Sequence, residues 1–309
     1  MDDLSKTPSA LHDARPAGVR IAAIRTWHSM LDDDVLGRSA QLAYYFFFAL
    51  FPGLIAVSSI IGLTVASDST LANDLLQYLS AIIPPSAFKI VADTLHQTTH
   101  ASSDSKIALG VLTALWSASV GTSALQDALN SVYDVKEGRP YWKARLNAIL
   151  LTIALITLFV IALAILLCGD ALAHVLSSHL GMGGVMVGVS RGLAWPLAFC
   201  ILAFAFALVY YFAPDVEQRK WAWITLGATV GIVAWISASL GLRLYLHYFD
   251  SYSLTYGSLG AVIVLLTWFY LSGLALLLGA EINSTREAMA AERGDPEAKE
   301  KGEKEPAVR

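Results

Sequence analysis

Charged residues are scarce in this 309-residue chain. Only 15% of the residues are Asp, Glu, Lys or Arg, while 56% are hydrophobic. An ordinary soluble domain contains about 25% charged residues, so this composition argues against a typical soluble enzyme or binding domain. The formal net charge of −4 is also a poor match for the basic surface that nucleic-acid binding requires. We therefore expect no nucleic-acid partner.

Cysteine and catalytic motifs are equally sparse. The two cysteines, Cys168 and Cys200, both fall within apolar stretches, which predicts small core side chains rather than a disulfide framework or a metal cluster. No GxSxG, P-loop or dinucleotide-binding fingerprint stands in a usable context. The sequence therefore predicts a protein that is not an enzyme, with no cofactor, no metal and no built-in ATPase.

Long apolar stretches dominate the chain instead. Each reaches the roughly 20 residues that a helix needs to cross a bilayer. The six stretches are 42–66, 107–133, 146–168, 192–213, 221–247 and 258–281. We therefore predict an all-α polytopic membrane protein with six transmembrane helices. The first 20 residues lack the apolar core of a cleavable signal peptide, so the first span is expected to remain as an anchor.

The distribution of Lys and Arg predicts how these spans are oriented. Six spans place both termini on one side, and 17 of the 21 Lys and Arg residues fall in segments on that side. By the positive-inside rule, both termini are cytoplasmic. The predicted domains are a cytoplasmic N-terminal segment (1–37), a six-helix transmembrane domain (38–285) and a cytoplasmic tail (286–309). The tail is rich in charge, Gly and Pro, which predicts disorder.

Three segments lie outside the spans. Residues 19–31 form an amphipathic helix, which either lies at the cytoplasmic interface or packs on the bundle. Residues 67–106 carry two apolar faces separated by a Pro-Pro pair, which predicts an outer helical hairpin. Residues 169–190 are Gly-rich, which predicts a flexible outer loop.

A metal-like pattern falls in the second of these segments. Asp93, His96, His100 and Asp104 share a face if 86–104 is helical. The HExxH arrangement of helical zinc sites is absent, because Gln97, Thr98 and Thr99 stand between the two histidines. We therefore expect no metal here.

The second apolar stretch carries a polar stripe. Ser119, Ser123, Gln126 and Asn130 are spaced i, i+4, i+7 and i+11, so they share one helical face, with Asp127 on its flank. Polar groups on a helix in lipid are costly unless they face protein, water or a substrate. Two interpretations stay open: the stripe forms hydrogen bonds to neighbouring helices, or it lines a cavity that binds a substrate.

The loop after the stripe is basic and aromatic, with Arg139, Tyr141, Trp142, Lys143 and Arg145. Such residues either anchor a protein at the membrane interface or bind the phosphate groups of anionic lipids. The candidate substrate-binding residues are therefore Ser119, Ser123, Gln126, Asp127, Asn130, Arg139 and Arg145.

Other spans contain features that favour packing or bending. Pro52 predicts a kink in the first span. Gly227 and Gly231 form a GxxxG motif, which is typical of close helix packing. Glu281 ends the last span and is expected to pair with Arg145 or Arg38.

Several longer strings resemble the YihY/BrkB family of bacterial inner-membrane proteins. They are AYYFFFALFPG (43–53), ALNSVYDVKEGRPYWKAR (128–145), YYFAPD (210–215), the Trp221/Trp223 pair, YGSLGAVIVLLTWFYLSG (256–273) and LLGAEIN (277–283). The resemblance implies six transmembrane helices and a location in the bacterial cytoplasmic (inner) membrane. Members of this family have carried a ribonuclease label, and others are linked to serum resistance or envelope lipid export. A nuclease is not expected here, because the carboxylates and histidines are scattered over both membrane sides.

The leading hypothesis is a transporter or lipid translocator that handles an anionic lipid or solute. Asp127, Asn130, Arg139 and Arg145 would bind the anionic group, with membrane phospholipids as partners, and Pro52 would allow a helix to move. GxxxG is compatible with a homo-oligomer. The alternative is a non-transporting scaffold that organises lipids or proteins of the envelope.

Overall fold

In the residues that it describes, the computed structural model of the chain contains helices and no strands. These residues are 9–65, 104–180, 183–217, 225–248, 258–295 and 298–305. The helices are α1 (Ser9–Asp32), α2 (Val35–Val65), α5 (Asp104–Val132), α6 (Tyr141–Leu180), α7 (Gly183–Phe212), α8 (Leu226–Tyr248) and α10 (Ser258–Glu292). The predicted all-α fold is confirmed.

Four helices contain stretches that are long and apolar enough to cross a membrane. These are Tyr141–Ala162 in α6, Gly192–Phe212 in α7, Leu226–Leu246 in α8 and Val262–Glu292 in α10. They correspond to four of the six predicted spans. The other two predicted spans correspond to α2 and α5, and their crossing of the membrane stays a prediction.

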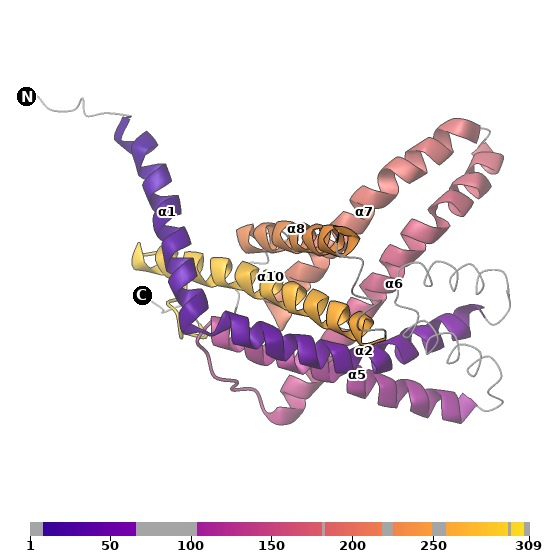
Figure 1. Ribbon diagram of the computed structural model, residues 1–309, viewed down its shortest axis with the longest axis horizontal. Helices are drawn as coiled ribbons and strands as arrows, with labels where there is room; N and C mark the ends of the chain where they lie inside the picture. The colour runs from indigo at the N-terminus through magenta and orange to yellow at the C-terminus, as the bar shows by residue number, and fades with distance from the viewer. Residues whose placement is uncertain are drawn as a thin grey trace, which may run out of the picture.

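The helices form two groups in Figure 1. α2 runs along α5, and α10 lies against both α2 and α8. α6 and α7 run beside each other as a long hairpin that extends away from the other helices. α2 contains Pro52 in its interior and changes direction near the middle of its length in Figure 1, as expected where proline removes a backbone hydrogen bond.

The α6–α7 hairpin corrects one prediction. The segment 169–190, predicted to be a flexible outer loop, is helical over most of its length, because α6 continues to Leu180 and α7 begins at Gly183. Residues 171–180 contain no glycine and include Ala and Leu, which favour helix, while most glycines of the segment follow from residue 181 onward. The predicted hairpin at 67–106 lies outside the described residues, apart from 104–106, which open α5.

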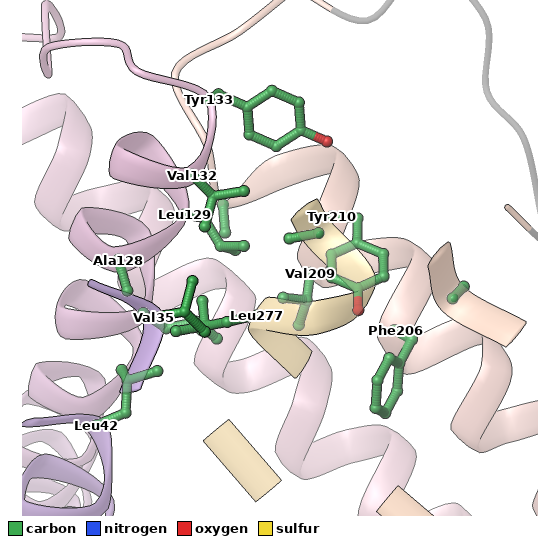
Figure 2. Packing of buried hydrophobic residues seen from close by; sticks show 14 of the residues in the cluster. Val35, Leu42, Ala128, Leu129, Val132, Tyr133, Phe206, Val209, Tyr210 and Leu277 are labelled. Carbon is green, nitrogen blue, oxygen red and sulfur yellow. The ribbon is translucent and has the colours of Figure 1, made fainter. Parts of the chain in front are cut away.

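The core lies where α2, α5, α7 and α10 meet (Figure 2). Leu42 of α2, Leu129 of α5 and Leu277 of α10 are almost completely buried, and Tyr210 of α7 packs in the same cluster. By contrast, large apolar side chains on α6, α7 and α8 are exposed, including Phe159, Trp195 and Leu240. An exposed apolar surface of this kind is stable against lipid tails, which fits the predicted spans.

Glycines allow α8 and α10 to approach closely. A side chain at Gly227 would meet the backbone of Gly279 and the side chain of Asn283. A Cβ at Gly231 would lie 3.1 Å from the carbonyl oxygen of Ala275. The GxxxG motif therefore serves helix packing within this chain.

The N-terminal helix α1 packs against α10 and α2, while several of its large apolar side chains stay uncovered. The Arg25 guanidinium lies 2.7 Å from the Glu292 carboxylate at the end of α10. Ile21, Ile24 and Trp27 are exposed. The helix thus packs in part on the bundle, and its position at the membrane interface stays a prediction.

The tail differs from the disordered segment that its composition predicts. Residues 286–292 continue α10, and residues 298–305 lie against the loops of the membrane domain. The Lys299 ammonium is buried, 3.1 Å from the Glu287 carboxylate, and the Gly302 amide donates to the carbonyl of Tyr133. Composition suggested disorder because the tail has little apolar surface, but its lysines find acidic and carbonyl partners on the folded domain.

Candidate functional site

The end of α5 determines where the basic loop runs. The Val135 amide donates to the carbonyl of Asn130 (2.9 Å) and the Asp134 amide to that of Ser131 (2.9 Å), while Asp134 has a φ of 55°. This pattern is a Schellman motif with Asp in the left-handed position. The chain then turns back, so that α6 starts below the middle of α5 in Figure 1.

The polar stripe is mostly turned into the protein. Ser119 is fully buried, and its hydroxyl donates to the carbonyl of Trp116 at 2.7 Å. Gln126 is buried too, and its Nε2 has no acceptor. Asp127 is exposed on the flank of the stripe, as the helical spacing predicts.

Asn130, at the C-terminal end of the stripe, connects three segments of the chain. Its Nδ2 donates to Glu137 (3.0 Å), and its Oδ1 accepts from the backbone amide of Asp215 (2.7 Å). One side-chain amide therefore bridges α5, the basic loop and the segment after α7. This arrangement matches the hydrogen-bonding interpretation of the stripe at this position.

Arg139 is held by acids within the chain. Its Nε and Nη2 donate to the two carboxylate oxygens of Glu137 at 2.8 and 2.7 Å, and Nη2 also donates to the carbonyl of Ala213 at 3.0 Å. The Asp215 carboxylate lies 3.6 Å from its Nε. Hydrogen bonding to Glu137 raises the pKa of Arg139 above its ordinary value. Burial alone would raise the pKa of Glu137, but hydrogen bonds from Arg139 and Asn130 outweigh it, so that this pKa is lowered.

The tail completes this cluster. The Lys304 ammonium contacts the Asp215 carboxylate, which also accepts from the Gly138 amide at 2.8 Å. The Glu217 amide donates to the carbonyl of Lys304 at 2.8 Å. We call the group Asn130, Glu137, Arg139, Asp215 and Lys304 the loop cluster.

Arg145 has a different environment. Its Nη1 donates to the hydroxyl of Ser123 (3.0 Å), its Nη2 donates to the carbonyl of Trp116 (2.8 Å), and its guanidinium lies 4.4 Å from the centroid of the Trp116 ring. Its contacts among the described residues thus include no carboxylate. Nearby in sequence, the Lys143 ammonium stands 5.4 Å from the ring of Trp142, and that ring is exposed.

The predicted site therefore divides into two parts. Asn130 and Arg139 belong to the loop cluster, whereas Ser123 and Arg145 form a second group beside Trp116, which we call the Arg145 group. Reasoning from the sequence missed Glu137 and Asp215. Glu137 stands two residues before Arg139, which is a usable signal, but Asp215 lies more than 70 residues away in the chain.

The expected pairing of Glu281 with Arg145 or Arg38 is wrong. Arg145 contacts Ser123 and Trp116, and the Arg38 Nε donates to the carbonyl of Asp33 at 2.9 Å. Neither arginine pairs with Glu281, whose carboxylate oxygens are buried without a hydrogen-bond partner.

Within the part of the chain that the structure describes, no group of three or more His, Cys, Asp or Glu side chains is placed to hold a metal ion. Of the metal-like pattern, Asp93, His96 and His100 lie outside the described residues.

Comparison with known proteins shows where the chain belongs. The family model described as Virulence factor BrkB matches residues 26–303. The chain is 34% identical over 247 residues to the Bacillus subtilis protein named "Putative ribonuclease-like protein YfkH", covering 80% of this chain and 88% of that protein.

The chain is also 28% identical over 275 residues to a UPF0761 membrane protein of Stenotrophomonas maltophilia (strain K279a), and this match covers 87% of the chain. A UPF0761 membrane protein of Xanthomonas oryzae pv. oryzae is 27% identical over 283 residues, which is 88% of the chain. The chain spans 61% of the length of both UPF0761 relatives. No solved structure matches. With its apolar helices, the chain is a multi-pass bacterial membrane protein of the Virulence factor BrkB family.

Proposed function

We propose that this protein is a transporter or lipid translocator of the cytoplasmic membrane, and that it handles an anionic lipid or solute. The observation that carries the proposal is the environment of Arg145. This guanidinium is held in place by a hydroxyl, a carbonyl and an aromatic ring, and its charge is not met by a carboxylate among the described residues. A cation in this state can bind a phosphate group without first breaking an ion pair.

The two parts of the predicted site take different roles in this proposal. Arg145 binds the anionic group, and Ser123 orients the guanidinium. Asp127 is exposed on the flank of the stripe and is assigned a role in binding the anionic group from its position in the sequence alone. Asn130 and Arg139 position the loop through the loop cluster, while Ser119 and Gln126 support the buried face of α5. Membrane phospholipids are the partners that supply such head groups, and both termini are on the cytoplasmic side in this arrangement.

Reconstitution in liposomes tests the proposal. We expect the parent protein to accelerate movement of a fluorescent phosphatidylglycerol analogue between leaflets, and Arg145→Gln to slow it. A basic side chain near an anionic surface contributes about 1 kcal/mol, which corresponds to a roughly fivefold weaker interaction. Arg145→Lys should recover only part of the activity, because Lys lacks the planar fork of Arg.

Arg243→Gln is the matched control, because Arg243 is an exposed arginine on α8, outside both parts of the site. Equal rates for Arg145→Gln and the parent would remove Arg145 from the mechanism. A parent that moves neither anionic nor zwitterionic lipids would instead favour a non-transporting scaffold. The scaffold is supported by the loop cluster, in which the predicted binding groups Asn130 and Arg139 are already engaged within the chain.

A further inference from the structure

A buried carboxyl group stands outside both parts of the site. Glu281 lies on α10 with 0% of its surface exposed, among the apolar side chains of the core. Neither of its carboxylate oxygens accepts a hydrogen bond. The hydroxyl of Thr285, four residues further along α10, is also buried and has no hydrogen-bond partner. An ionised carboxylate in this position would lose its hydration without compensation, which costs several kcal/mol.

The charged groups that face Glu281 come from three other segments. The acid that interacts with Glu281 is Asp33, in the turn between α1 and α2, and the cation that interacts with it is Lys301 of the tail. The Lys301 ammonium lies 2.6 Å from the Asp33 carboxylate. Tyr133, at the end of α5, is the phenol within electrostatic reach. Two carboxyl groups therefore share a single ammonium group, and that ammonium is already bound to Asp33.

We propose that Glu281 and Asp33 form a buried proton-binding site that Lys301 closes from the tail. One proton on the pair leaves a single carboxylate opposite a single ammonium, so that the charges of the three groups balance. Without that proton, the site would hold one uncompensated negative charge, with the Glu281 carboxylate fully buried and Asp33 only 15% exposed. The inference does not depend on lipid movement, and it holds for a transporter and for a scaffold.

A proton fits this site better than a metal cation does. Hard cations take about six to eight oxygen ligands, and the groups assembled here are two carboxyls and one hydroxyl. The adjacent Lys301 ammonium also repels a second cation. Release of the proton would place a second charge beside Lys301, so proton binding is coupled to the position of the tail.

Infrared difference spectroscopy on the full-length protein in lipid nanodiscs tests the proposal. We expect a carbonyl stretch of a protonated carboxylic acid at neutral pH, disappearing as the pH is raised. Glu281→Gln should remove this band. Glu292→Gln is the matched control, because Glu292 is an exposed acid on the same helix that pairs with Arg25. Loss of the band in Glu281→Gln alone supports the site, and a band that survives in this variant overturns it.

A second variant keeps the test decisive if Glu281→Gln does not fold. Lys301→Met removes the cation that stabilises the ionised acids, so the band should persist to higher pH than in the parent. A band that titrates at the same pH in Lys301→Met and the parent contradicts the proposed role of the tail. A band that appears only when sodium or potassium is withdrawn would identify a metal-cation site and also overturn the proposal.

Discussion

Replacing Arg139 tests whether the loop cluster stabilises the packing of α5, the basic loop and the segment after α7. Arg139→Gln removes the paired hydrogen bonds to Glu137 and the ionic contact with Asp215. It leaves Glu137 and Asp215 without their shared arginine, in positions where their side chains are only 27% and 18% exposed.

The expected loss of stability follows from these contacts. Buried hydrogen bonds to charged groups contribute about 1.5–3 kcal/mol each, whereas exposed ion pairs contribute about 0–1 kcal/mol. The Arg139 side chain is 20% exposed, so its contacts are neither fully buried nor fully exposed. We therefore expect each contact to contribute an energy between these two values. Because the contacts act on one side chain and are not additive, we expect a loss of about 2–3 kcal/mol for Arg139→Gln.

Thermal unfolding of the purified protein in nanodiscs, followed by tryptophan fluorescence, measures this loss. We expect the midpoint to fall by roughly 3–5 °C, because the unfolding entropy of a chain of this length is about 0.65 kcal/mol per kelvin. Lys143→Gln is the control, because the Lys143 ammonium contacts the Trp142 ring in an exposed position. Its replacement should change stability by no more than about 0.5 kcal/mol. Equal midpoints for Arg139→Gln and the parent would refute the structural role of the loop cluster.

The same cluster predicts a pH dependence. The pKa of Glu137 is lowered in the folded protein from an ordinary value of 4.5. Its contribution to stability is therefore present above pH 4.5 and is lost as the pH falls through the lower folded pKa. We expect the parent to lose stability over this acidic range, and Arg139→Gln to lose less of it. An identical acidic slope in both proteins would show that Glu137 is not stabilised by Arg139.

Two further predictions concern helix packing and the tail. Gly227→Ala should destabilise the protein by about 1–3 kcal/mol, because the added methyl would meet the backbone of Gly279. Gly241→Ala on the same helix is the control, because no neighbouring atom lies within 4 Å of a Cβ added there. Equal unfolding midpoints for the two variants would contradict the close α8–α10 contact. Deleting residues 296–309 should lower the unfolding midpoint and increase protease cleavage within 133–140. The reason is that the Lys304 ammonium contacts the Asp215 carboxylate and the Gly302 amide donates to the carbonyl of Tyr133. An unchanged midpoint and unchanged cleavage would show that the tail does not stabilise this loop.

The loop cluster and the Arg145 group bear differently on function. Asn130 and Arg139 are engaged by partners within the chain, so their replacement should act first on stability. Arg145 keeps its charge uncompensated among the described residues, so its replacement should act first on lipid movement. Measuring stability and movement on the same variants separates the two roles.

Much of the local structure follows from patterns within short stretches of sequence. The apolar stretch 192–213 almost coincides with the apolar segment Gly192–Phe212 of α7, because a run of this length forms a helix wherever it is taken out of water. The spacing of Ser119, Ser123, Gln126 and Asn130 likewise places them on one face of α5 before any partner is known. The extension of α6 to Leu180 was missed, because glycines from residue 181 onward were taken to describe the whole connection.

The sequence by itself determined the membrane character, the all-helical fold and the polar face of α5, since each depends on composition or on neighbours within a few helical turns. Only the tertiary structure decided which polar residues are engaged. Arg139 and Arg145 look alike in the sequence, but Glu137 and Asp215 surround the first, while Trp116 and Ser123 hold the second. Glu281 was likewise separated from both expected arginines and placed beside Asp33 and Lys301. Asp215 and Lys301 contact residues far away in the chain. These contacts depend on how the helices cross and on where the tail packs, and the periodicity of a single helix does not encode either of these.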